Sequence, residues 1–87
     1  MVVELTGRIA ISRAGNDRGR YYLVIGVDKG FALIADGDRK PLQKPGRKNI
    51  RHLSVTKTAI KGWEKLVSGE RVSSNLKLVG LLKKIGR

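Results

Sequence analysis

The chain has 87 residues, no cysteine, one histidine and a formal net charge of +12 at pH 7. This length suits one small domain, and the lack of cysteine excludes disulfides and the thiolate zinc sites of zinc fingers. We expect no metal, no cofactor and no catalytic site, because one histidine cannot build a multi-histidine centre. The N-terminus lacks the pattern of a secretory signal, and no stretch approaches the about 20 apolar residues of a membrane span. We therefore expect a cytoplasmic protein with no membrane partner.

The positive charge is concentrated in the second part of the chain. Residues 1–38 carry five basic and five acidic residues, whereas residues 39–87 carry fourteen basic and two acidic ones. Within that part, residues 39–51 hold six cations and no acid. A one-sided charge of this kind suits a polyanion, most often a nucleic acid.

Three strands are predicted in the first part of the chain. Residues 7–13 alternate apolar and polar side chains, which predicts a half-buried strand with Ile9 and Ile11 on one face. Residues 21–27 and 31–35 are rich in β-branched and aromatic side chains and predict two further strands, joined by a short hairpin turn.

The loop between the first two strands has strong turn chemistry. Gly15 and Gly19 can take positive φ angles, and we expect Asp17 to stabilise the turn. The alternation in the next strand turns Tyr21 and Tyr22 to opposite faces, so at least one of the two rings belongs to the core.

Two prolines between residues 39 and 49 forbid a helix there, and they have no backbone N–H to donate to a neighbouring strand. We therefore predict an edge segment or a loop here. Residues 50–55 alternate again and predict a last short strand. Five short strands predict a mainly β fold, a small antiparallel barrel over residues 1–55 that includes the basic loop 39–51.

Residues 56–87 change to helical spacing and predict a two-helix C-terminal tail. The first helix is predicted from about residue 58 to Gly69, with Thr56 or Thr58 as its cap. We expect Trp63 to anchor this tail on the barrel.

The second helix is predicted over residues 74–85, with Ser73 or Ser74 as its cap. Its apolar positions pack either on the barrel or on another chain. A protein partner at the C-terminal helices is therefore one expectation.

Residues 7–25, GRIAISRAGNDRGRYYLVI, resemble the KOW motif, a strand, a glycine-containing loop and a second strand found in ribosomal proteins and NusG-type transcription factors. Gly19 looks like its characteristic glycine. The resemblance continues through residues 35–39 and residues 44–53, KPGRKNIRHL. Together these segments are similar to small bacterial KOW-domain RNA-binding proteins related to the fourteenth large-subunit ribosomal protein of archaea and eukaryotes. The resemblance implies an SH3-like barrel and an RNA partner, usually ribosomal RNA.

Two groups of residues are predicted to bind RNA. The first group, from the basic loop, comprises Arg39, Lys40, Lys44, Arg47, Lys48, Asn49, Arg51 and His52. The second group comprises the loop arginines Arg13, Arg18 and Arg20 together with the motif glycines Gly15 and Gly19. Cations hold phosphates, and arginine does so with two parallel hydrogen bonds. Asn49 either hydrogen-bonds a base edge or a ribose, or closes its own turn.

These features predict a non-enzymatic RNA-binding protein that associates with ribosomal RNA or the ribosome and acts in translation. Two alternatives stay open. The first is a protein-interaction module of the transcription or translation machinery, and the second is DNA binding through the C-terminal helices. The basic loop can also be a solvated segment with no ligand, and the two glycines can serve ordinary hairpin geometry alone.

Overall fold

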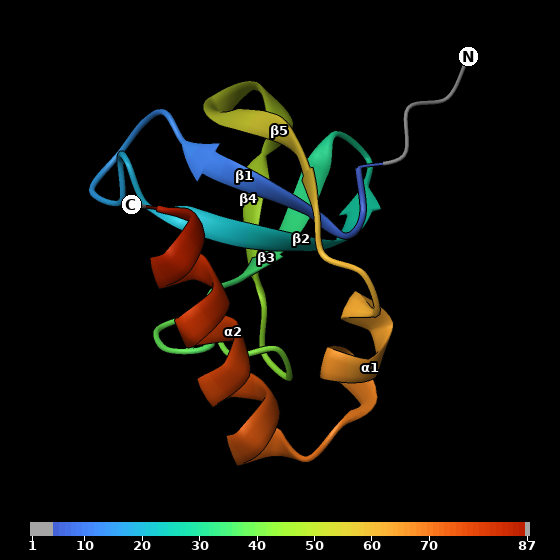
Figure 1. The fold of residues 1–87 in the computed structure, drawn as a ribbon. Coiled ribbons are helices and arrows are strands. Elements are labelled where there is room, and N and C mark those ends of the chain that lie inside the picture. Colours follow the sequence, from blue (N-terminus) through green and yellow to red (C-terminus); the bar gives the residue numbers. More distant parts are fainter. Residues whose placement is uncertain (1–4, 87) are drawn as a thin grey trace.

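The structure is a computed structural model that describes residues 5–86, so the outer ends of the predicted domains 1–55 and 56–87 lie outside it. Its elements in chain order are β1 (Arg8–Ser12), β2 (Tyr21–Asp28), β3 (Phe31–Ala35), β4 (Gly46–Asn49), the 3₁₀ turn η1 (Ile50–His52), β5 (Leu53–Ala59), α1 (Trp63–Ser68) and α2 (Arg71–Ile85). The strands form one sheet, and both helices lie on the same side of it (Figure 1).

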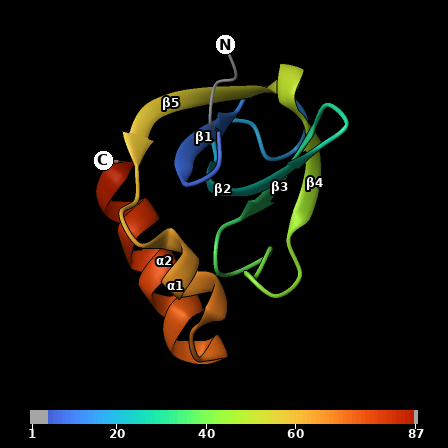
Figure 2. The same ribbon diagram turned by 90° about the vertical axis from the view of Figure 1, so that its right-hand side faces the viewer.

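The strands form a five-stranded antiparallel sheet in the order β4-β3-β2-β1-β5. The first four strands follow one another as a meander, and β5 returns to pair with β1, where Ala10 lies opposite Val55. Register shifts between Arg8 and Ala10 and between Val24 and Gly26 bend the strands. The sheet therefore curls, as Figure 2 shows.

The five predicted strands are present in one antiparallel sheet, but the predicted barrel is wrong, because β4 and β5 stay at opposite edges of the sheet within residues 5–86 and do not close it. Between β4 and β5 the chain turns through η1, where the Asn49 side chain accepts a hydrogen bond from the Arg51 backbone N–H. The predicted strand over residues 50–55 begins only at Leu53 and runs on to Ala59. The fold is a small mixed α/β domain, an open antiparallel sheet followed by helices.

Both faces of the sheet are buried. The core on one face consists of Ile9, Leu23, Ala35, Leu42, Leu78 and Leu82, the last two contributed by α2. The core on the other face, inside the curl, consists of Ala10, Tyr22, Val24, Ala32, Ile34 and Leu53. β1 was predicted to bury one face only. Because the sheet curls, both faces of β1 are covered: the neighbouring residues Ile9 and Ala10 are both fully buried, whereas Ile11 is partly exposed. Tyr22 is the buried member of the tyrosine pair, which confirms that at least one ring is core.

The first helix is shorter than predicted. Residues up to Ala59 belong to β5, where Ala59 pairs with Arg8, and α1 begins only at Trp63 after Gly62 turns the chain at a φ of 76°. Thr56 does not cap the helix, because its hydroxyl donates to the Ile9 carbonyl at 2.7 Å and so belongs to the sheet. The predicted end at Gly69 is confirmed.

The second helix begins three residues before its predicted start. Its cap is Glu70, whose carboxylate accepts from the Ser73 backbone N–H at 2.7 Å, so neither predicted serine is the cap. Trp63 packs against the core that faces α2, and its ring leaves no room for a Cβ at Gly7, which confirms the predicted anchor. Neither described helix has the length and apolar character needed to cross a membrane.

Candidate nucleic-acid interface

The loop between β1 and β2 is a tight, hydrogen-bonded turn. Gly15 and Gly19 have φ angles of 85° and 88°, as the turn chemistry predicts. The Gly19 N–H donates to the Ser12 carbonyl at 2.8 Å, and the Arg20 N–H donates to the Asp17 carbonyl at 2.9 Å. A Cβ at Gly19 would meet no atom within 4 Å, so this position needs glycine for its backbone angle and not for space.

Asp17 organises this loop from inside. One carboxylate oxygen accepts from the Ser12 hydroxyl at 2.8 Å and from the Lys48 ammonium at 2.9 Å, and the other accepts from the Tyr22 hydroxyl at 2.7 Å. Burial acts to raise the pKa of Asp17, but these hydrogen bonds and the Lys48 charge outweigh it and lower the pKa. Burial and the bond to Asp17 raise the pKa of Tyr22. The prediction that Asp17 stabilises the turn is confirmed.

Lys48 joins the basic segment to this loop. Besides its bond to Asp17, 31 residues away in sequence, its ammonium donates to the Ala14 carbonyl at 3.0 Å. The Arg13 N–H donates to the His52 carbonyl at 2.8 Å, which adds a backbone contact beside it. The Lys48 side chain is only 16% exposed, so this cation is a structural one, and a phosphate would have to compete with Asp17 for it.

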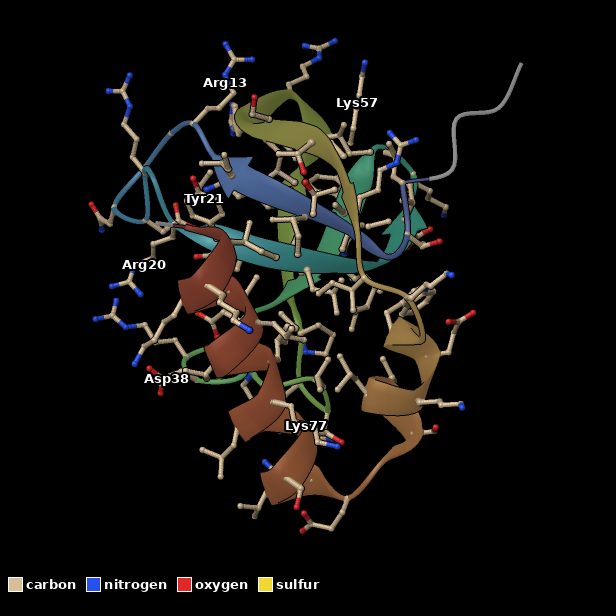
Figure 3. The ribbon with its side chains drawn as sticks, in the orientation of Figure 1. Arg13, Arg20, Tyr21, Asp38, Lys57 and Lys77 are labelled. Carbon is tan, nitrogen blue, oxygen red and sulfur yellow. The ribbon has the colours of Figure 1, made fainter. Side chains whose placement is uncertain are left out.

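Three exposed arginines and the exposed His52 lie on the two segments that meet at this junction. We call the loop–turn surface the set formed by the loop residues Arg13 and Arg18 and the η1 residues Arg51 and His52, all of which are exposed. These residues come from the two groups predicted from the sequence, and the backbone bond from Arg13 to His52 joins the loop to η1. In Figure 3 Arg13 points away from the helices. Lys57 on β5 points the same way and was missed by sequence analysis, because it follows the basic loop as an isolated cation.

Arg20 lies apart from this surface. It lines a cavity of about 180 Å³ with Asp36, Asp38 and Lys83, and Figure 3 shows it on the same side of the molecule as Asp38. Because two acids share this cavity, the local charge around Arg20 is close to balanced.

The first part of the basic segment is a structured turn. The Asp36 carboxylate accepts from the backbone N–H groups of Asp38 and Lys40, each at 2.9 Å. The Lys40 side chain is partly buried, with its ammonium 5.4 Å from the centroid of the Tyr22 ring and its stem filling the space beside Gly46. Lys40 is therefore packed, whereas Arg39 and Lys44 on either side of it are exposed.

The remaining two predicted residues also have partners within the chain. The Asn49 side chain closes its own turn, which is one of the two roles left open for it. The Arg47 guanidinium lies 4.7 Å from the centroid of the Phe31 ring, a cation–π contact that covers part of this exposed ring.

Asn75 is a positioning residue that sequence analysis missed. Its side-chain oxygen accepts from the Leu42 N–H at 2.9 Å, and its amide nitrogen donates to the Gln43 side chain and to the Arg71 carbonyl, each at 2.8 Å. Asn75 is 8% exposed, so these bonds fix the basic segment onto α2 from a buried position. The only signal in the sequence is a lone amide in an apolar stretch of helix.

Comparison of the sequence with protein-family models and with curated proteins returned no match. No cluster of three or more histidine, cysteine, aspartate or glutamate side chains suited to a metal ion occurs within residues 5–86.

Proposed function

We propose that the protein is a non-enzymatic RNA-binding protein that binds ribosomal RNA or ribosomal particles in the cytoplasm through the loop–turn surface. One observation carries the proposal: the Lys48 ammonium bonds to both Asp17 and Ala14 and so fixes the KOW-like loop against the basic segment. Three exposed arginines and His52 then lie on the two segments that this junction holds together. The resemblance of residues 7–25 to the KOW motif supports RNA as the ligand, carried here on an open SH3-like sheet.

Such a surface suits recognition of phosphates and shape more than of bases. Arginine side chains match phosphate geometry, and a fixed backbone reduces the entropy lost on binding. Lys40 and Lys48 have partners within the chain, so the number of phosphates engaged is smaller than the count of cations suggests. With roughly three phosphates neutralised, one for each arginine of the surface, affinity for a duplex should fall about 40-fold between 50 and 200 mM salt.

The test is sedimentation of the full chain from cell lysate on sucrose gradients at low and high salt, with crosslinking and sequencing of bound RNA. We expect co-migration with ribosomal particles at low salt, loss at high salt, and crosslinks to the loop–turn surface. The variant Arg13→Glu with Arg51→Glu should abolish co-migration. The matched control, Lys65→Glu with Arg71→Glu, makes the same charge change on the two helices and should retain it.

Two results would refute the proposal: migration of the wild-type protein free of RNA at low salt, or equal loss of binding in both double variants. Of the alternatives, a specific observation favours only the protein-interaction role, and it concerns a different surface, described next. DNA binding through the helices stays a prediction.

A further inference from the structure

A groove runs between α1 and α2. It consists of two adjoining hollows of about 690 and 480 Å³, which share Leu66, Lys77 and Leu81 as lining residues. Figure 3 shows Lys77 between the two helices, at the end of the molecule away from Arg13. We call this feature the α1–α2 groove.

The floor of the groove is apolar and open. Leu66 and Leu81 are partly exposed in it, and a Cβ at Gly80 would meet no atom within 4 Å. On the same helix as Gly80, Val72 is 63% exposed and Leu76 is 66% exposed. These three residues lie one turn apart on one side of α2, so the two exposed side chains adjoin the groove without lining it. Exposed apolar side chains beside an apolar hollow favour an interaction site.

The rim of the groove is basic. Lys61, Lys65, Lys77 and Lys84 line it, and none of them forms an ion pair within residues 5–86. The single acid, Glu70, uses its carboxylate to cap α2. The groove therefore combines an apolar floor with a rim of four lysines and one acid, which is net positive.

We propose that the α1–α2 groove binds an acidic amphipathic helix of a partner protein. The apolar side chains of such a helix, spaced three and four residues apart, would lie on Leu66, Gly80 and Leu81, and its carboxylates would meet the lysines. A second copy of this chain is a poor occupant, because it would bring the same lysines against each other. RNA offers phosphates to the lysines but no aliphatic side chains to the floor. The groove is separate from the loop–turn surface, so the protein would join an RNA to a protein.

The probe is a fluorescent peptide of about 18 residues with leucines on one helical face and glutamates elsewhere, compared with a scrambled peptide of the same composition. Fluorescence anisotropy with the full chain should show about tenfold tighter binding of the patterned peptide, since a matched apolar face adds to the charge attraction. Gly80→Leu fills the floor, and Lys77→Glu with Lys84→Glu reverses the rim. Each variant should weaken binding about tenfold, while Lys83→Glu, on the same helix but lining another cavity, should not.

Circular dichroism and thermal melting would establish that the variants fold, and the rim variant tests the groove independently of the filled floor. Equal binding of the two peptides, or unchanged binding by folded Gly80→Leu, would overturn the proposal. Displacement of the peptide by RNA, with RNA binding lost in the rim variant, would instead assign the groove to RNA and overturn it as well. The groove variants should leave ribosomal co-migration intact, so failure of the proposed RNA function and failure of this docking role are distinguishable.

Discussion

Replacing Lys48 by methionine tests the junction between the loop and the basic segment. The substitution keeps an unbranched side chain one atom shorter than lysine, but removes the charge and both hydrogen bonds, to Asp17 and to Ala14. The two paired side chains are 16% and 17% exposed, so the Asp17 charge would stay largely buried. Breaking a buried pair costs about 3–5 kcal/mol. Ser12 and Tyr22 still donate to the carboxylate, so we expect a loss of about 2–3 kcal/mol.

The measurement is urea denaturation at pH 7 with a thermal melt, where a loss of this size lowers Tm by roughly 10–20 °C in a domain of this length. Lys44→Met is the control: this lysine is exposed, and its loss should change the free energy of unfolding by less than about 0.5 kcal/mol.

The pH dependence has a definite sign. The pKa of Asp17 is lowered in the folded protein, so the pair stabilises the fold above the unfolded pKa of about 3.9 and loses this effect as pH falls toward the folded value. The stability gap between the wild type and Lys48→Met should therefore narrow below about pH 4. Equal stability of the two proteins at pH 7, or a gap that stays constant down to pH 3, would refute the reasoning.

Three further substitutions test a buried hydrogen bond and two glycine positions. Asn75→Ala removes the acceptor of the Leu42 N–H, and should destabilise the fold by about 2 kcal/mol and speed hydrogen exchange at that amide; protection equal to wild type would contradict the positioning role. Gly19→Ala should cost about 1–2 kcal/mol because its φ is 88°, although the space is open. Gly80→Ala, in an exposed and equally open helical position, should instead raise the free energy of unfolding by about 0.5–1 kcal/mol. Thermal melts of the two glycine-to-alanine variants should therefore shift Tm in opposite directions. Tm shifts of the same sign would show that the backbone angle at residue 19 does not determine the effect of its alanine.

Sequence patterns predicted the features that depend on near neighbours. The strand at residues 31–35 has the predicted bounds, and the positive φ angles of Gly15 and Gly19 follow from local turn chemistry. The helix predicted from residue 58 was wrong at its start. Its three- and four-residue apolar spacing coincided with a segment rich in β-branched residues, which favour a strand. Pairing of Ala59 with β1 decides for the strand over the helical spacing.

Contacts between distant parts of the chain could not be predicted. Lys48 looked like any other cation of the basic loop, because nothing near it in sequence indicates that Asp17 is its partner. The η1 turn, which replaces the first part of the strand predicted over residues 50–55, likewise carries a side-chain bond from Asn49 that the strand pattern did not indicate. Both outcomes alter the candidate site: the first removes a free cation, and the second places Arg51 and His52 beside the loop.

The core beneath the sheet is completed by α2, which is synthesised after all five strands. Leu78 and Leu82 of α2 cover Ile9, Leu23 and Ala35, which belong to the first three strands. β5 must likewise return to β1, so that Arg8 meets Ala59. During synthesis, the early meander therefore presents an uncovered apolar face until α2 emerges, and such faces favour aggregation. A nascent chain that pauses before residue 71 would expose this face, and a longer pause would leave more time for aggregation.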